Sequence, residues 1–128
     1  MTNSESLLLD THVFLWWREA NERITPAVVE TVSGAESVFV SAASAWEVAI
    51  KVALEKLRIP EPFERGVEDS GFHELPITFG HAAAVTALAP HHRDPFDRML
   101  IAQSVVERLT IVTHDRRFEP YGVPVIWV

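Results

Sequence analysis

Acidic side chains occupy separate points of this sequence at which an apolar segment ends or a helix is expected to begin. Asp10 directly follows the apolar residues 7–9, and Asp115 lies two residues beyond Thr113, the last residue of another apolar run. Carboxylates brought together from separate segments repel one another strongly unless a cation lies between them. The set consists of Asp10, Glu47, Asp97 and Asp115, with Asp94 close to Asp97.

Oxygen ligands of this kind favour particular metals and a particular chemistry. Carboxylate oxygens are hard ligands, and the sequence has no cysteine and no histidine cluster with the spacing of a zinc site. Mg²⁺ or Mn²⁺ is therefore the expected cation. One or two such ions activate water and stabilise the leaving oxygen in phosphodiester hydrolysis. The acids thus predict a divalent-metal site suited to that reaction.

Short apolar runs alternate with helical segments and set the expected positions of these acids. The expected strands are residues 7–9, 38–40, 110–113 and 123–128. Strands that are apolar on both faces and alternate with helices predict an α/β three-layer sandwich, with a central parallel sheet flanked by helices. Ligands of such sheets collect beyond the carboxyl ends of the strands, so Asp10 and Asp115 should reach the same edge. We expect the 128 residues to form a single domain.

Helical periodicity is clearest in the segment that carries Glu47. The apolar positions are Trp46, Ile50, Ala53, Leu54 and Leu57, and the charged stripe consists of Glu47, Lys51 and Glu55. This pattern predicts a helix with two distinct faces. The other expected elements are a short helix at 63–70, an edge or connecting strand at 72–77, helices at 80–88 and 94–109, and a short helix or turn at 115–121.

Each acid also has a structural interpretation that the sequence leaves open. Asp94 has the signature of a helix N-cap followed by Pro95 at the first helical position, and Asp97 would then complement the helix dipole. The two acids that follow strands can likewise cap the segments after them. Glu47 can be a solvated partner of Lys51 at the i+4 position. Capping and function can coexist, because a site opens where helices start.

The charge distribution narrows the classes of function. The formal net charge of −7 argues against a surface that coats nucleic acid in general. Four of the eleven basic residues nevertheless lie within three positions of the acids at 94, 97 and 115, and form a local basic rim. These residues are Arg93, Arg98, Arg116 and Arg117.

The composition also bears on the compartment. The absence of cysteine removes thiolate chemistry and agrees with a reducing cytosol. The first six residues include no basic region, and the apolar runs are far shorter than the ~20 residues of a membrane-spanning helix. We therefore expect a cytoplasmic protein with no export signal and no membrane partner.

Two kinds of aromatic side chain lie near these motifs. Trp16 and Trp17 are adjacent, so on a helix they point about 100° apart, and one of them can serve a protein interface while the other packs in the core. His91 and His92 stand beside Arg93 and can hold phosphate or tune proton transfer, although loop histidines are usually solvated. The histidines without ligand spacing are His12, His73, His81 and His114.

Three motifs follow one another in a specific order. They are Leu-Leu-Leu-Asp-Thr-His at 7–12, Ser-Ala-Ala-Ser-Ala-Trp-Glu-Val-Ala-Ile-Lys at 41–51, and Asp-Pro-Phe-Asp-Arg-Met-Leu-Ile-Ala-Gln at 94–103. Together with residues 109–115 and 121–127, they resemble PIN-domain proteins of the VapC toxin type. The likeness covers essentially the whole chain.

The resemblance implies a sheet sandwiched by helices, three or four acids that bind Mg²⁺ or Mn²⁺, and endoribonuclease activity as the toxin of a toxin–antitoxin pair. Asp10, Glu47 and Asp97 match the three most regular acid positions of the family. Asp115 stands at a position that varies between acid and amide, and Asp94 belongs to an Asp-Pro-x-Asp variant. The resemblance also implies a cognate antitoxin that blocks the acidic site, and a homodimer that places two sites near each other.

Three functions stay open from the sequence. In the first, metal-activated water cleaves RNA, and the residues expected to contact the strand are Thr11, Arg93, Arg98, Thr113 and Arg116. In the second, Asp10 is a covalent phosphoryl acceptor of a phosphotransfer or phosphatase domain. His12 stands where one such family has a second acid, which weighs against this hypothesis. The third function is a non-catalytic protein-binding module of the same fold, against which the intact set of acids argues.

Overall fold

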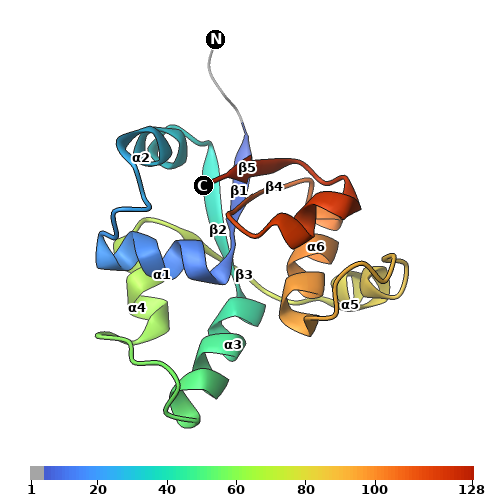
Figure 1. The fold of residues 1–128 in the computed structure, drawn as a ribbon, viewed down its shortest axis with the longest axis horizontal. Helices are drawn as coiled ribbons and strands as arrows, with labels where there is room; N and C mark the ends of the chain where they lie inside the picture. Colours follow the sequence, from blue (N-terminus) through green and yellow to red (C-terminus); the bar gives the residue numbers. More distant parts are fainter. Residues whose placement is uncertain (1–4) are drawn as a thin grey trace.

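Five parallel strands form the central layer of the computed structural model, which describes residues 5–128 (Figure 1). The strands are β1 (Ser6–Leu9), β2 (Ser37–Ser41), β3 (His73–Leu75), β4 (Thr110–Thr113) and β5 (Val125–Trp127). Their order in the sheet is β3-β2-β1-β4-β5. At the centre, Leu8 of β1 pairs with Phe39 of β2 and Ile111 of β4. Because every pairing is parallel, the carboxyl ends of all strands lie at one edge.

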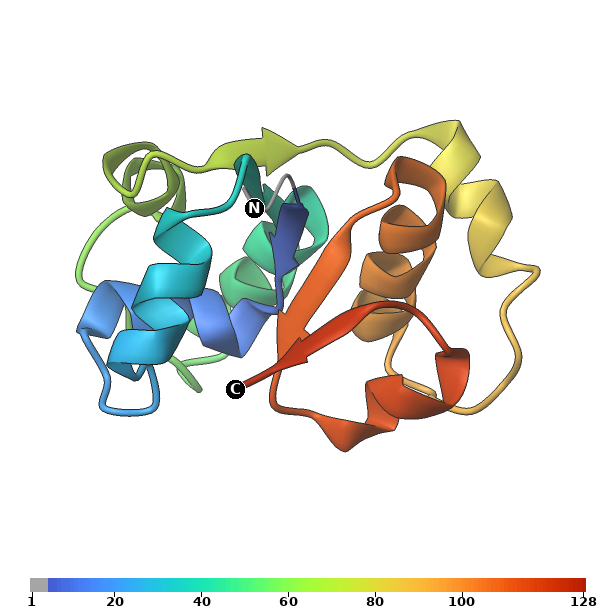
Figure 2. The same ribbon diagram turned by 90° about the horizontal axis from the view of Figure 1, so that it is seen from above.

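Helices cover both faces of this sheet (Figure 2). One face carries α1 (Thr11–Glu19), α2 (Pro26–Ser33) and α4 (Phe63–Asp69), and the other carries α6 (Pro95–Glu107) and the 3₁₀ helix η1 (Arg116–Tyr121). α5 (Phe79–Val85) packs on α6, and α3 (Ala42–Ala53) leaves the end of β2 and contacts both α1 and α6. The expected three-layer α/β sandwich is confirmed.

The three consecutive leucines of β1 join the two halves of the core. Leu7 and Leu9 pack into the cluster that contains Phe14 of α1, whereas Leu8 packs into the cluster that contains Phe118 of η1. All three leucines are completely buried. A strand covered on both faces must be apolar at successive positions rather than at alternate ones. Each buried leucine stabilises the fold by about 2 kcal/mol, so β1 is a rigid base for the residue that follows it.

Polar side chains at the carboxyl edge cap the elements that start there. The N-cap residues are Asp10 for α1, Ser41 for α3, Asp94 for α6 and Asp115 for η1. Each accepts a hydrogen bond from a backbone N–H two residues further along, which is worth about 1 kcal/mol per cap. The capping interpretation of these three aspartates is therefore correct, and it fixes their carboxylates at the edge of the sheet.

Most expected elements are confirmed, with one omission and some shifted ends. α2 lies in a segment where no element was predicted, although Thr25 caps it and Pro26 occupies its first turn. The helix expected at 94–109 ends at Glu107, because Arg108 takes the left-handed conformation, with φ of 57°. The expected edge strand at 72–77 is the shorter β3, which pairs with β2 in parallel.

The apolar face of α3 points outward and its charged face points inward, which is the opposite of a typical surface helix. The apolar stripe faces solvent, with 61% of Trp46 exposed and both Ile50 and Leu54 exposed as well. Glu47, on the charged stripe, is only 7% exposed. The helix therefore turns its charged face toward the carboxyl edge of the sheet. On the apolar face, Trp46 packs edge-on against Phe96 of α6, with ring centroids 5.2 Å apart, while most of its surface stays exposed.

The expectation of no export signal concerns in part residues 1–4, which lie outside the described residues. Among residues 5–128, no helix has the length and apolar character needed to cross a bilayer.

Candidate functional site

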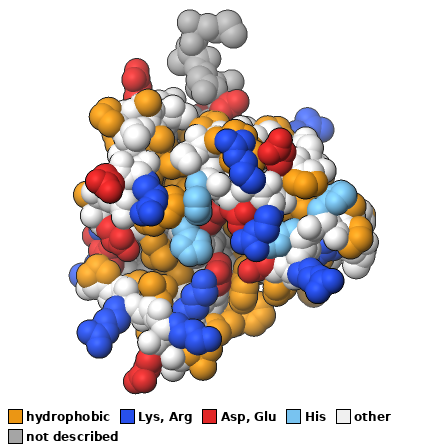
Figure 3. Space-filling view, viewed as in Figure 1, with side chains coloured by type: hydrophobic (Ala, Val, Ile, Leu, Met, Phe, Trp, Pro, Cys, Tyr) orange, Lys and Arg blue, Asp and Glu red, His pale blue; other side chains and the backbone are white. Residues whose placement is uncertain are grey.

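A cleft of about 550 Å³ opens at the carboxyl edge of the sheet and brings all the predicted acids together. In the space-filling view, acidic side chains lie in a hollow at the centre of this face, with histidines and basic side chains around them (Figure 3). The cleft is lined by Asp10, Glu47, Asp94, Asp97 and Asp115, by Lys51, Arg116 and Arg117, and by His12, Trp16 and His114. The acids come from β1, α3, the start of α6 and the turn after β4, so tertiary folding alone assembles them.

Asp10 is the most buried of the acids. One carboxylate oxygen, Oδ1, accepts the backbone N–H of His12 at 2.9 Å, and the other, Oδ2, accepts the hydroxyl of Thr113. Burial raises the pKa of Asp10 above its ordinary value, although both hydrogen bonds act to lower it. The ionised carboxylate is thus held in place but is costly to form without a nearby cation.

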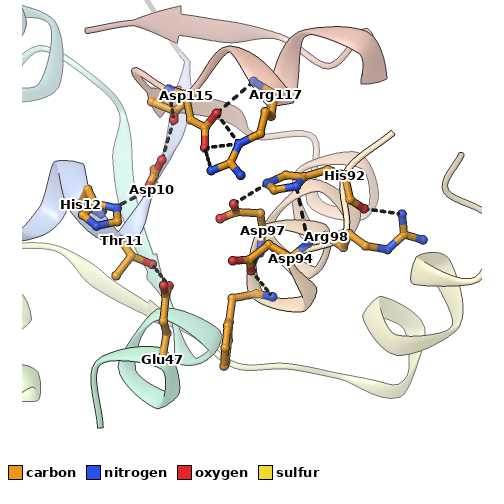
Figure 4. Close-up of polar contacts among 12 residues, drawn as sticks. Asp10, Thr11, His12, Glu47, His92, Asp94, Asp97, Arg98, Asp115 and Arg117 are labelled. Carbon is orange, nitrogen blue, oxygen red and sulfur yellow. Dashed lines mark hydrogen bonds and ion pairs between the residues drawn. The ribbon is translucent and has the colours of Figure 1, made fainter. Parts of the chain in front are cut away.

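Glu47 reaches the cleft from the second turn of α3 (Figure 4). Its Oε1 accepts the hydroxyl of Thr11 at 2.9 Å, and Ser44 Oγ lies 2.8 Å from the same threonine oxygen. Its Oε2 lies 2.9 Å from Nζ of Lys51, as the i+4 spacing suggested. The predicted pairing with Lys51 is confirmed, but Glu47 is buried rather than solvated, because α3 turns it toward the cleft.

Asp97 lies in the first turn of α6, and its environment disfavours the charged form. Burial raises the pKa of Asp97 to about 7, and the negative charges of Asp94 and Asp10 add to this effect. A hydrogen bond with His92 acts in the opposite direction. Without a cation the side chain is therefore close to half protonated at neutral pH. A divalent ion in the cleft would restore its full charge.

His92 supports Asp97 from the loop before α6. Its Nε2 lies 2.7 Å from Oδ2 of Asp97, and its Nδ1 faces the backbone N–H of Asp94 at 3.5 Å. Because Nδ1 accepts, Nε2 carries the proton and donates it to the carboxylate. The ring is buried and packs edge-on against Phe118, with centroids 6.3 Å apart. His92 thereby fixes the orientation of Asp97.

Asp115 forms an ion pair with Arg117. Its Oδ1 accepts both the backbone N–H and Nε of Arg117 at 3.0 Å, and its Oδ2 lies 2.7 Å from a terminal guanidinium nitrogen, Nη2. Hydrogen bonding to Arg117 lowers the pKa of Asp115. The charge of this acid is therefore balanced within the chain, in contrast to the charges of Asp10 and Asp97.

The donor set fits a hard divalent cation. Ligand atoms of His92, Asp97 and Asp115 lie within 4.8 Å of one another. Because both ring nitrogens of His92 are engaged with Asp97 and Asp94, the carboxylates are the available ligands, and the charge of Asp10 acts on Asp97. Carboxylate oxygens in excess over nitrogen favour Mg²⁺ or Mn²⁺ rather than zinc. The raised pKa values of Asp10 and Asp97 are those of a cluster that needs a positive charge.

The two threonines expected to contact substrate are oriented toward the acids. Thr11 and Thr113 are buried, and they donate their hydroxyls to Glu47 and Asp10, respectively. These contacts orient the carboxylates of Glu47 and Asp10 in the way that outer-shell partners orient metal ligands.

The three arginines expected to contact substrate occupy different places. Arg116 lines the cleft, and its guanidinium lies 4.1 Å from the ring centroid of Trp127. Arg98 turns away from the cleft and donates to backbone carbonyls of residues 85, 88, 89 and 92 and to the hydroxyl of Tyr121. Arg93 lines a separate apolar groove beside the start of α6. Only Arg116 of the three lines the acidic cleft.

Sequence reasoning overlooked several residues of the cleft. His12 and His114 were set aside for lack of ligand spacing, yet each neighbours a strand-end acid in the sequence and lines the cleft. His92 was expected to be solvated, as loop histidines usually are, but it is buried against Phe118. Proximity in sequence to Asp10 and Asp115 was the signal available for the first two. The position of Trp16 in the cleft became evident from the tertiary structure, because no sequence pattern indicates it.

The family model that matches this chain is that of the PIN domain, over residues 7–123. The match spans all the acids of the cleft and most of the sheet. The chain belongs to the PIN domain family.

Known PIN-type proteins resemble the chain over nearly its full length. Ribonuclease VapC22 of Mycobacterium tuberculosis (strain ATCC 25618 / H37Rv) is 27% identical over 122 residues, which cover 93% of this chain and 94% of that protein. The VapC-type resemblance seen in the motifs is therefore confirmed.

Several solved structures share the fold of this chain. VapBC2 from Rickettsia felis, bound to a DNA fragment from its promoter, matches with a TM-score of 0.68 at 10% identity, over 94% of this chain and 96% of that one. DNA-bound VapBC from Salmonella typhimurium matches with a TM-score of 0.67 at 19% identity, over 95% and 97%. FitAcB from Neisseria gonorrhoeae matches with a TM-score of 0.62 at 23% identity, over 94% and 96%.

Proposed function

We propose that this PIN-domain protein is a Mg²⁺- or Mn²⁺-dependent endoribonuclease, the toxin of a toxin–antitoxin pair. The observation that carries the proposal is the meeting of Asp10, Glu47, Asp97 and Asp115 in one cleft, with the pKa values of Asp10 and Asp97 raised. A cluster that is costly to ionise alone is suited to binding a cation. The similarity to a protein described as a ribonuclease supports RNA as the substrate.

Asp10, Glu47 and Asp97 would hold the ion, with Asp115 completing the set and Asp94 adding negative charge beside them. The divalent ion, when bound, supplies the positive charge and the water activation that phosphodiester hydrolysis requires. Thr11 and Thr113 keep two of the carboxylates oriented, and His92 does the same for Asp97. Asp94 keeps α6 starting at the cleft by capping its first turn.

Basic side chains at the margin would bind the RNA backbone. Arg116, Arg117 and Lys51 line the cleft beside the acids. Phosphates entering between them meet positive charge on a protein whose net charge is −7. Electrostatic attraction to RNA would thus be confined to the margin of this site.

The proposed partners are an antitoxin that covers the site and a second copy of the chain, in the cytoplasm. Similar folds have been solved as toxin–antitoxin complexes, which supports the antitoxin. Exposed apolar side chains are also available to a protein partner: Trp46 of α3 and Leu54 at its C-terminal end are more than half exposed, and Phe79 is almost fully exposed. Such side chains are typical anchors of protein interfaces.

The test is RNA cleavage by Asp10→Asn with Asp69→Asn as its matched control, since Asp69 is an exposed aspartate on α4. In the presence of Mg²⁺ or Mn²⁺, Asp10→Asn should lose cleavage while Asp69→Asn retains it, and EDTA should abolish cleavage by the unsubstituted protein. Calorimetric titration with Mn²⁺ should show binding that disappears in Asp10→Asn. Unchanged cleavage by a folded Asp10→Asn protein would overturn the proposal.

A further inference from the structure

One wall of the cleft is aromatic rather than charged, and the proposed metal chemistry does not use it. His12, Trp16 and His114, here called the aromatic wall, line the same cleft as the acids. The ring centroids of Trp16 and His114 are 4.7 Å apart, and those of Trp16 and His12 are 6.3 Å apart. Trp16 therefore lies next to two imidazole rings that come from different segments of the chain.

Trp16 anchors the aromatic wall to the core of the protein. Trp16 is partly buried on α1 and packs against the core cluster around Phe14, while the guanidinium of Arg23 lies 4.9 Å from its ring centroid. His12 and His114 are exposed. Two imidazoles thus offer accessible ring surface, and the tryptophan that supports them is fixed by cation–π and core contacts.

The wall is also close to the reacting centre proposed above. The backbone N–H of His12 donates to Oδ1 of Asp10 at 2.9 Å, and both His12 and His114 line the same cleft as this carboxylate. Figure 4 shows the His12 ring beside Asp10, on the side of the cleft opposite Asp97. A phosphate held at the acids would therefore place the base of an adjoining nucleotide within reach of the wall.

The basic side chains of the cleft each contact another side chain of the protein, so stacking of a base can add to their affinity for RNA. Lys51 is paired with Glu47, Arg117 is paired with Asp115, and Arg116 lies over Trp127. The attraction of these cations for the RNA backbone is therefore shared with their partners in the chain. Stacking of an unpaired base on an aromatic ring does not depend on charge and is available to every base.

We propose that the aromatic wall is a base-stacking subsite, in which an unpaired RNA base next to the cleaved phosphate packs on the imidazoles of His12 and His114. This inference rests on the proposed function, because it takes RNA as the substrate. The subsite would favour single-stranded RNA, because a base in a duplex must first be unstacked and unpaired, which costs free energy.

The test uses a short single-stranded RNA of mixed sequence that contains 2-aminopurine, whose fluorescence falls when the base stacks. Binding is measured in the Asp10→Asn protein, so that the RNA stays intact. The background protein and its His114→Phe derivative should quench the probe. Replacing His12 and His114 by Ala should reduce the quenching to what Trp16 alone provides and weaken binding about 5- to 100-fold. His73→Ala, at an exposed histidine on β3, is the matched control and should behave as the background does.

The same substitutions in the active protein separate the two proposals. His12→Ala and His114→Ala should raise the KM for single-stranded RNA more than they lower kcat, and His114→Phe should restore the KM. Equal quenching and equal KM in the alanine variants would overturn the subsite and favour a protein partner on the wall. Quenching without any metal-dependent cleavage by the unsubstituted protein would instead overturn the proposed function and retain the subsite.

Discussion

Two histidine–carboxylate pairs flank the same helix, and they differ in what surrounds them. At the start of α6, His92 lies 2.7 Å from Asp97. At its end, His81 of α5 lies 2.8 Å from Glu107. Both imidazoles are buried, but the side chain of Asp97 is 14% exposed, whereas that of Glu107 is 42% exposed. Similar local contacts are thus placed in a closed acidic cleft in one case and at an open surface in the other.

The surroundings decide the role of each pair. Asp97 meets the negative charges of Asp94 and Asp10, which makes it a candidate ligand. Glu107 has solvent around it, and His81 is held by the capping box of α5, where Thr78 N–H donates to its Nδ1 at 3.1 Å. The second pair therefore fastens α5 to α6. A buried histidine beside a carboxylate indicates chemistry only when other charges converge on that carboxylate.

The largest expected difference between the pairs is in catalysis. Asp97→Asn removes a proposed ligand and should reduce RNA cleavage by about 1,000-fold or more, beyond the 10- to 100-fold loss typical of an outer-shell partner. Glu107→Gln, the matched change in the other pair, should leave cleavage within a few-fold. Steady-state rates at saturating Mg²⁺ check both. Similar losses in the two variants would contradict the assignment.

The next difference concerns the dependence of stability on pH in the absence of metal. The pKa of Asp97 rises from 3.8 to about 7 on folding, so between these values the folded protein binds more protons than the unfolded chain. Its contribution to the free energy of unfolding therefore falls as pH rises from about 4 to 7, by about 2–4 kcal/mol. Denaturation in EDTA should show this fall in the wild type and a weaker one in Asp97→Asn. Identical profiles would contradict the prediction.

Mn²⁺ should reverse that loss of stability. An ion that binds only the folded protein raises the unfolding temperature, and it competes with protons for the carboxylates. The increase should therefore be larger at pH 8 than at pH 5.5. Thermal unfolding with and without Mn²⁺ measures it, and an increase that is independent of pH would place the ion elsewhere.

A smaller effect separates the two histidines. His92→Ala frees Asp97 to rotate and should weaken Mn²⁺ binding about 10- to 100-fold, with partial rescue by His92→Gln, whose amide can donate to the carboxylate. His81→Ala should lower the free energy of unfolding by about 1–3 kcal/mol and leave Mn²⁺ affinity unchanged. Calorimetric titration and urea denaturation together give both quantities. A loss of Mn²⁺ affinity in His81→Ala would show that the pairs are not distinct.

The smallest effect is expected at Arg117, whose ion pair with Asp115 is exposed on the arginine side. Because exposed pairs contribute little, Arg117→Gln should change the free energy of unfolding by less than about 1 kcal/mol. The pKa of Asp115, now lowered by Arg117, should rise toward its ordinary value. Carboxylate titration by NMR measures it, and an unchanged pKa would contradict the pairing.

The sheet and the set of acids were predictable because they depend on local patterns. The leucines of β1 had to form a strand buried on both faces, and a polar residue directly after such a strand must lie at the edge of the sheet. Asp10 follows from this rule, and Asp115, two residues beyond the end of β4, follows from it closely. The start of α6 followed from the Asp-Pro pair, because both residues favour the first turn of a helix.

Other features depended on tertiary contacts that periodicity does not encode. The apolar stripe of α3 indicates a helix but not its orientation, and the structure turns Glu47 inward and Trp46 outward. His92 is buried because Phe118, from a distant segment, packs against it. The aromatic wall combines α1 with the turn after β4, so neither segment alone reveals it.

Anomalous diffraction at the manganese edge, from crystals grown with Mn²⁺, tests the central claim most directly. The account predicts a peak in the cleft about 2.0–2.3 Å from carboxylate oxygens of Asp10 and Asp97, and no such peak in crystals of Asp97→Asn. A well-occupied peak outside the cleft, or an empty cleft at saturating Mn²⁺, would contradict it.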